Sequence, residues 1–418
     1  MKTKLSQYGA AFIFFVPAFL FLLLALFSCS KKNTMVPEKK TESTGPKLPA
    51  TPYEYPIGGN NDLATLGRVL FYDKNLSGDR SVSCGSCHQQ AYGFADNKLL
   101  SKGAYGVLAG RNTHVIVNND NSRFWDGKNQ MIFNAVSTTC STTTSTVLTS
   151  GYNVSTTPTS TATVTSTTCL DEIIQNSVFT NPIKIPFITT GEMNIGLQEL
   201  SERVSALSYY SDLFSKAFPG NHDPFTEANI ETAIGTFMDN IIVNKSKFDL
   251  VGSSGLSSEE ANGYHLFNGK AKCNLCHKEN NNFAGTPGQF EDIGLDAVYT
   301  DPGRGRFGNL STNEGRFHVP SLKNVELTAP YMHDGRFSTL EQVVDFFNSG
   351  VHHSANLSSA MTIHAIPDGN GGFNTGGTFQ PLALTITEKA NLVAFLKTLT
   401  DHSVVSDDKL SDPFRHLR

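Results

Sequence analysis

The chain has 418 residues, which at about 150 residues per domain is room for two domains with extensions. Hydrophobic residues make up 39% and charged residues 17%, with 35 Gly and 18 Pro, a composition typical of a loop-rich globular protein and not of a disordered chain. The formal net charge is -5 and no segment concentrates Lys and Arg, which argues against a nucleic-acid partner.

The first 28 residues have the pattern of an export signal. Lys2 and Lys4 precede an apolar run over residues 10–27, which Ser28 and Cys29 follow. This junction resembles a bacterial lipobox, so we expect lipid on Cys29 and a protein anchored in the cell envelope, facing the periplasm. An uncleaved membrane helix is the alternative. Residues 29–56 are polar and rich in Pro, Lys and Thr, which predicts a flexible tether.

A Ser/Thr-rich stretch over about residues 135–178 predicts an insertion and not a part of a core. Cys140 and Cys169 mark its ends. In an oxidising compartment a disulfide between them would close this loop, a constraint worth about 3 kcal/mol in the chain-entropy model. Two free thiols are the alternative.

Apolar residues recur at helical spacing, with capping residues, in six segments. These are residues 62–71, 197–218, 226–243, 257–267, 339–347 and 387–399. Strand-like alternation is sparse outside the insertion, so the predicted fold is mainly α with long loops. A boundary near residue 220 divides the chain into residues 57–220 and 221–418.

Each half contains one Cys-x-x-Cys-His motif: Cys84, Cys87 and His88 in the first, Cys273, Cys276 and His277 in the second. Two cysteines at this spacing can form thioethers to the vinyl groups of one haem, and the histidine then ligates its iron. A structural zinc site or a thioredoxin-like redox pair is the rival interpretation. The duplicated motif on an exported chain favours two tandem cytochrome c-like domains with two covalently bound haems c.

Six further blocks, in order along residues 62–399, resemble the bacterial dihaem cytochrome c peroxidase family, specifically its MauG-like branch. They are Leu66-Gly67-Arg68-Val69-Leu70-Phe71, Gly110-Arg111-Asn112-Thr113, Phe124-Trp125-Asp126-Gly127, Gly191-Glu192-Met193, Pro320-Ser321-Leu322-Lys323-Asn324-Val325 and Ala329-Pro330-Tyr331-Met332-His333-Asp334-Gly335.

The resemblance implies roles for residues of the first half. His88 would be the proximal ligand of the peroxidatic haem. Ordinary members carry a blocking distal histidine seven residues before the arginine of the Arg-Asn pair, where this chain has Ala104. As in the MauG-like branch, this haem is therefore expected to be five-coordinate. Glu192 aligns with the distal glutamate, the acid-base group of peroxide cleavage. A solvated loop carboxylate is the alternative.

The resemblance also implies groups between the haems. Trp125, the only tryptophan, aligns with an electron relay, with an ordinary core aromatic as the alternative. Asn112, Thr328 and Pro330 align with positions that bind a calcium ion through oxygen atoms.

The second haem, on His277, would receive the electrons. Phe347 stands where the family places its sixth ligand, and phenylalanine cannot ligate iron. This haem is either five-coordinate, or His352, His353 or Met361 replaces the ligand, with His353 as the named candidate. Other histidines, His114 and His318 among them, are expected to be structural or surface groups.

The predicted function is reduction of hydrogen peroxide to water by a cytochrome-c peroxidase-like oxidoreductase. Electrons would come from a small donor protein, such as a monohaem cytochrome c or a cupredoxin, through the second haem. One alternative is a MauG-like oxidase acting on a partner protein, and another is a dihaem electron carrier without enzymatic activity. The resemblance also implies that the chain could form a homodimer.

Overall fold

The computed structural model describes residues 44–57, 59–118, 124–127, 183–285, 289–307, 311–362, 379 and 381–417, and the backbone of a hairpin at 137–148 and 161–172. The predicted signal peptide, Cys29 and most of the tether lie outside these residues and stay predictions. Within the described residues, no helix is both long and apolar enough to cross a bilayer.

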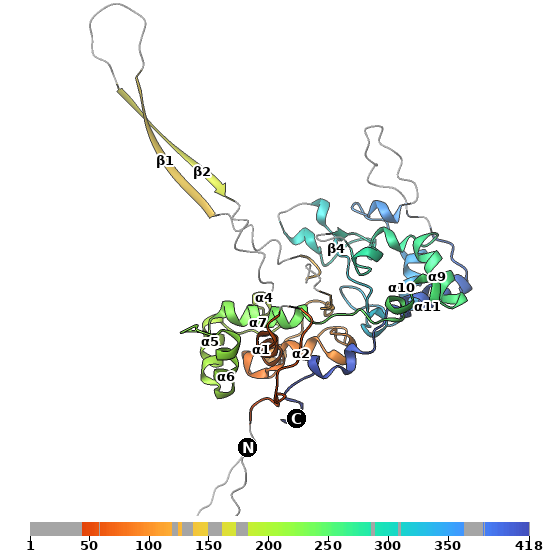
Figure 1. Ribbon diagram of the computed structural model, residues 1–418. Helices are drawn as coiled ribbons and strands as arrows, with labels where there is room; N and C mark the ends of the chain where they lie inside the picture. The colour runs from red at the N-terminus through yellow and green to blue at the C-terminus, as the bar shows by residue number, and fades with distance from the viewer. Residues whose placement is uncertain are drawn as a thin grey trace, which may run out of the picture. The chain divides into compact units, whose positions relative to one another are not determined.

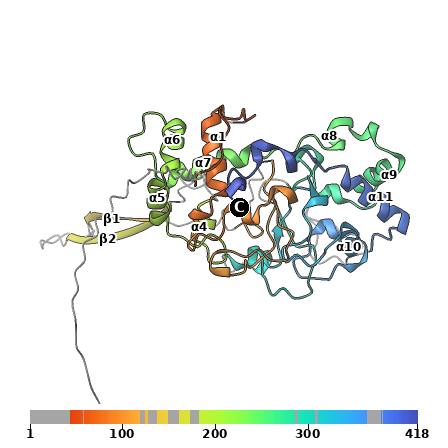
Figure 2. The same ribbon diagram turned by 90° about the horizontal axis from the view of Figure 1, so that it is seen from below.

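The described chain is rich in helices, as predicted, and these gather in two groups (Figures 1 and 2). The first half contains α1 (Asn61–Tyr72), α2 (Cys84–Cys87), α4 (Lys184–Ile188), α5 (Leu197–Ala206), α6 (Ser208–Ala217) and α7 (Glu227–Asp239). The second contains α8 (Lys247–Val251), α9 (Ser258–Asn268), α10 (Leu340–Asp345) and α11 (Ile386–Lys397). Strands β3 (Phe290–Glu291) and β4 (Phe317–His318) form a short antiparallel pair.

The first hydrophobic core forms where α1 crosses α7. The helices touch at Gly67, where a Cβ would lie only 1.9 Å from the carbonyl oxygen of Ala233. Helix α7 follows the boundary predicted at residue 220, yet it packs in this core, as does Val243 after it. The exact division into domains stays a prediction.

The second core repeats this arrangement with α9 and α11. Here the close approach is at Gly263, where a Cβ would lie 2.0 Å from the carbonyl oxygen of Asn391. In both halves the helix at the glycine is the one that precedes the Cys-x-x-Cys-His motif. The crossing therefore fixes the start of each haem-binding turn.

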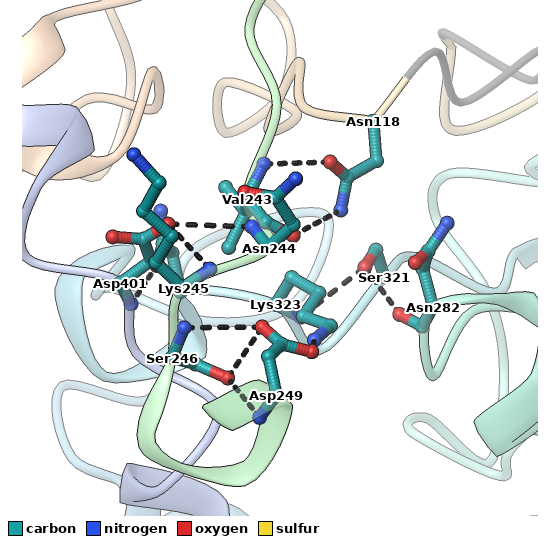
Figure 3. Close-up of polar contacts among 11 residues, drawn as sticks. Asn118, Val243, Asn244, Lys245, Ser246, Asp249, Asn282, Ser321, Lys323 and Asp401 are labelled. Atoms are coloured by element: carbon teal, nitrogen blue, oxygen red, sulfur yellow. Dashed lines mark hydrogen bonds and ion pairs between the residues drawn. The ribbon is translucent and has the colours of Figure 1, made fainter.

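Side-chain hydrogen bonds hold the segment that joins the two cores (Figure 3). The side chain of Asn118 accepts from the amide of Val243 at 2.7 Å and donates to its carbonyl oxygen at 3.2 Å. The buried carboxylate of Asp401 accepts from the amides of Asn244 and Lys245 at 3.3 and 3.0 Å. Although burial opposes it, hydrogen bonds from Ser403 and from these amides keep the pKa of Asp401 below its ordinary value, so the carboxylate stays ionised.

The C-terminal segment returns to the first half (Figure 1). Val404, Leu410 and Phe414 belong to the first core. The hydroxyl of Tyr72 donates to the carbonyl oxygen of Leu410 at 2.7 Å, and Arg68 donates to that of Asp408 at 2.7 Å. The first core therefore uses residues from both ends of the described chain.

The predicted insertion contains an antiparallel hairpin of β1 (Ser137–Leu148) and β2 (Thr161–Glu172). Its register sets Cys140 directly opposite Cys169. The backbone pairing is therefore compatible with the predicted disulfide, while the side chains lie outside the described atoms and the bond stays a prediction.

Candidate haem and peroxide site

The first Cys-x-x-Cys-His motif forms a single helical turn. Ser83 and Ser86 cap α2 reciprocally, and His88 is its C-cap residue. A Cβ at Gly85 would lie 2.4 Å from the ring of Tyr72, so only glycine fits between the two cysteines at this point. The packing of this turn on α1 explains why the sequence has glycine there.

Both motif histidines present one nitrogen to a ligand. Nδ1 of His88 lies 3.2 Å from the carbonyl oxygen of Phe94, and Nδ1 of His277 lies 3.1 Å from those of Phe283 and Pro320. A carbonyl oxygen only accepts, so Nδ1 carries the hydrogen and Nε2 keeps its lone pair. Burial lowers the pKa of each imidazole to about 4, which favours the neutral form that binds metal.

The two loops after these histidines have the same backbone geometry. Gln89 bridges to Ala95, and Lys278 bridges to Ala284 at the corresponding positions. Phe94 and Phe283 both adopt left-handed backbone angles, with φ of 64° and 55°. The motif and its loop are thus one local unit that occurs twice.

Burial raises the pKa of the Cys84 and Cys273 thiols to about 12 and that of the Cys87 and Cys276 thiols to about 11. A redox-active Cys-x-x-Cys pair needs a lowered thiol pKa, which is the opposite of what burial produces here. No group of three or more His, Cys, Asp or Glu side chains that could hold a metal ion occurs among the described residues. The geometry therefore supports neither rival interpretation and fits haem attachment.

A large, mainly apolar cavity lies at the second motif. Cys273, Cys276 and His277 line it, as does Trp125 from the first half. Apolar walls beside two thiols and one unprotonated imidazole nitrogen suit a porphyrin, which buries a large apolar surface.

Glu192 and Ala104 are neighbours in space, although 88 positions separate them by number. The amide of Ala104, which is fully buried, donates to the carbonyl oxygen of Glu192 at 2.8 Å. The half-buried carboxylate also helps to raise the pKa of the Cys84 and Cys87 thiols, after the larger effect of burial, so it lies near the first motif. Ala104, at the position of the distal histidine of ordinary family members, thus lies next to Glu192, the predicted acid-base group.

Trp125 lies beside the cavity, and hydrogen bonds hold it at both ends. Its Nε1 donates to the carbonyl oxygen of Asn112 at 2.8 Å, and its own carbonyl oxygen accepts from the amide of His318 at 2.8 Å. This tryptophan therefore connects segments of the two halves.

The three predicted calcium residues, Asn112, Thr328 and Pro330, line the same cavity. The amide nitrogen of Asn112 donates to the carbonyl oxygens of Lys98 and Leu99 at 3.0 and 3.3 Å, which orients the side chain. Their proximity is compatible with a shared cation, and the calcium ion stays a prediction.

The candidates for the sixth ligand separate clearly. Phe347 lies in a π-helical turn after α10 and lines the cavity. His352 and His353 are exposed and do not line it. Met361 lines it. The expected preference for His353 therefore has no support in the geometry.

The sequence did not indicate two buried polar groups beside the cavity. One is an ion-pair cluster, in which Arg111 contacts Asp126 and Asp301, each at 2.6 Å. Although burial opposes it, the Arg111 guanidinium lowers the pKa of Asp301 to about 2. The other is the pair His114 and His318, both buried, which the sequence analysis had assigned to structural or surface positions. Distant segments build both groups, so spacing along the chain gives no signal for them.

Comparison with known proteins agrees with this geometry. The family model "Di-haem cytochrome c peroxidase" matches residues 61–255. The methylamine utilization protein MauG of Methylorubrum extorquens is 28% identical over 345 residues, 81% of this chain and 78% of that protein. The cytochrome c551 peroxidase of Nitrosomonas europaea is 29% identical over 307 residues, 71% of this chain and 76% of that protein.

The solved structure of a MauG-like protein associated with microbial copper homeostasis has a TM-score of 0.63 at 27% identity. The superposition covers 89% of this chain and 97% of the chain in that structure. The chain is thus similar to the di-haem cytochrome c peroxidase family. Similarity to a di-haem family implies two haems c, which agrees with the two Cys-x-x-Cys-His turns.

Proposed function

We propose that this protein is a dihaem peroxidase that reduces hydrogen peroxide to two waters with two electrons and two protons. The observation that carries the proposal is the meeting of Ala104 and Glu192 near the first haem-binding turn. With the methyl group of Ala104 in place of a distal histidine, no side chain at this position would block peroxide at the haem that His88 would hold. Relatives named as cytochrome-c peroxidases support the same activity.

The haem supplies the redox chemistry when bound, and the chain supplies ligation, proton transfer and positioning. Glu192 would take the proton from the peroxide oxygen nearer to His88 and return it to the oxygen that leaves as water, because hydroxide is a poor leaving group. Hydrogen bonds from the Phe94 and Phe283 loops would hold His88 and His277 in orientation. The two cores would then correspond to two haem domains, the second accepting electrons from a donor protein.

Met361 is the side chain that we propose as the sixth ligand of the second haem. Two other side chains of the cavity wall already have contacts: Tyr331 donates to the carbonyl oxygen of Val325 at 3.0 Å, and the ring of His333 stacks on that of Phe317 with centroids 3.8 Å apart. His318 lies two residues from Pro320, whose carbonyl oxygen contacts Nδ1 of His277, so this segment runs on the proximal side. Met361 follows α10 and precedes α11, in the same part of the second half as Phe347.

The test of the function is the substitution Glu192→Gln, which keeps the size of the side chain and removes the acid-base group. We expect peroxide turnover with reduced cytochrome c to fall by about 10²-fold or more, with two haems still attached. Glu202→Gln, at an exposed position of α5, is the matched control and should keep normal turnover. Near-normal turnover of Glu192→Gln would remove this residue from the mechanism.

A MauG-like oxidase is the second candidate, because the MauG relative covers most of this chain. Such an enzyme would take its electrons from a partner protein rather than from a soluble donor. Steady-state peroxide consumption by the purified protein separates the two functions. Rapid turnover with reduced cytochrome c supports the peroxidase, and turnover that needs a specific partner protein supports the oxidase.

A further inference from the structure

Two buried histidines from different halves of the chain form a hydrogen-bonded pair near both haem-binding turns. Nε2 of His114 lies 3.1 Å from Nδ1 of His318, and the ring centroids are 5.2 Å apart. The exposed fractions of the two residues are only 6% and 3%. Neither histidine belongs to a Cys-x-x-Cys-His motif, so haem attachment does not account for them.

The direction of this hydrogen bond follows from its surroundings. Nδ1 of His114 lies 2.8 Å from the carbonyl oxygen of Val115, which can only accept, so Nδ1 carries the hydrogen. Burial lowers the pKa of His114 to about 4 and that of His318 well below its ordinary value, so both rings are neutral near pH 7. A neutral ring has one N–H, and His318 therefore donates from Nδ1 to Nε2 of His114.

Each member of the pair is connected to one of the predicted iron ligands. His114 lies close enough to the buried imidazole of His88 to affect its pKa, after the larger effect of burial. His318 lines the cavity of the second motif, and two residues further on the carbonyl oxygen of Pro320 contacts Nδ1 of His277 at 3.1 Å. A path of covalent and hydrogen bonds thus runs from His114 through His318 to His277, and its His114 end lies close to His88.

Trp125 stands beside this path. Its ring meets that of His114 edge to face, with centroids 4.9 Å apart, and its carbonyl oxygen accepts from the amide of His318 at 2.8 Å. The pair is therefore placed both to carry electronic coupling itself and to hold the tryptophan in position. The hydrogen bond between the two rings joins the half that carries His114 to the half that carries His318.

We propose that the His114–His318 pair is a route for electrons between the two haems, with both histidines acting as positioning residues. One electron passes from the second haem to the first in each transfer. No bond forms or breaks, and the imidazoles keep their protons and their oxidation state. The inference rests on the proposed function only in requiring two attached haems, and it does not require peroxide to be the substrate.

The test measures electron exchange between the haems without peroxide. In the full-length protein reduced by one electron, carbon monoxide is released from the first haem by a light flash, and the redistribution of the electron is followed by absorbance. We expect His318→Phe, which removes the hydrogen bond, to slow this exchange about tenfold or more, the size of effect that groups supporting metal ligands commonly have. Haem content and the spectra of both haems should remain those of the wild type.

Two further variants separate the hydrogen bond from packing. His318→Asn keeps a donor close to His114 and should recover most of the wild-type rate. Phe290→Leu disturbs a ring that packs against His318 at 5.9 Å without touching the hydrogen bond, and should leave the rate unchanged.

An unchanged rate in His318→Phe, or an equal loss in Phe290→Leu, would overturn the proposal. If His318→Phe fails to carry two haems, His114→Phe breaks the same hydrogen bond from the other side and is judged by the same two outcomes. If the wild-type protein showed no peroxide turnover, the proposed function would be contradicted. The measurement of electron exchange between the haems would still test this proposal.

Discussion

Phe347 and Met361 lie on the wall of one cavity, and in our proposal Met361 supplies the iron ligand that Phe347 cannot. A phenylalanine at the first position contributes packing and cannot bind iron. A thioether at the second position is a ligand that raises haem reduction potential relative to a second histidine. The identity of a single side chain thus decides how readily the second haem accepts electrons.

Replacement of Met361 by leucine keeps its volume and removes its sulfur. We expect the second haem of Met361→Leu to change from low-spin to high-spin and to lose the near-infrared charge-transfer band of sulfur ligation. Absorbance and electron paramagnetic resonance spectra of the ferric protein measure both changes. Met332→Leu, at another methionine of the cavity wall, is the control and should alter neither signal. A wild-type spectrum in Met361→Leu would exclude this ligand.

At the scale of helices, Gly67 and Gly263 allow the close approach of the paired helices in the two cores. In α1 a side chain at Gly67 would collide with the backbone of α7, whereas Gly235 in α7 faces only the flexible end of Ile183, 3.3 Å from an added Cβ. The two positions belong to the same helix pair and differ in what surrounds them. Alanine substitutions at the two positions therefore distinguish the free-energy cost of a steric collision from the helix propensity of alanine.

Gly67→Ala should lower the free energy of unfolding by about 1–3 kcal/mol, because the crossing must widen to admit the methyl group. Gly235→Ala should be neutral or stabilising by up to about 1 kcal/mol, since alanine favours the helix and the Ile183 side chain can move. Urea unfolding of the haem-loaded protein measures both values. A Gly67→Ala protein as stable as Gly235→Ala would contradict this account of the crossing.

Periodicity in the sequence predicted most helices because each buries one apolar face, and α1, α7, α9, α10 and α11 lie within the predicted segments to a residue or two. The segment at residues 197–218 was predicted as one helix but is two, because Leu207 adopts an extended conformation with ψ of 112°. The haem-binding turns were predictable from local spacing. The His114 and His318 contact was not, because 204 positions separate the two residues.

At the scale of the whole chain, the C-terminal segment completes the first core. Val404, Leu410 and Phe414 are buried there, and the side chain of Gln90, close to His88, donates to the carbonyl oxygens of Val404 and Asp407 at 2.8 Å each. Stability of the first half therefore depends on residues that follow the entire second half in sequence.

Removal of residues 404–418 should destabilise the first half by roughly 5 kcal/mol, from the loss of three buried apolar side chains. Chemical unfolding followed at the first haem measures this change. A chain ending at Arg415 keeps the buried residues and should unfold like the wild type. Equal stability of the two shortened chains would contradict a role for the segment in the core.

The hydrogen bond from the Tyr72 hydroxyl to the carbonyl oxygen of Leu410 joins residues that are 338 positions apart in the sequence. In the export that the first 28 residues predict, a chain emerging in sequence order would present its first pair of thiols long before this hydrogen bond could form. The first porphyrin would then be joined to a partly folded chain, and arrival of the distant segment would close the protein around it.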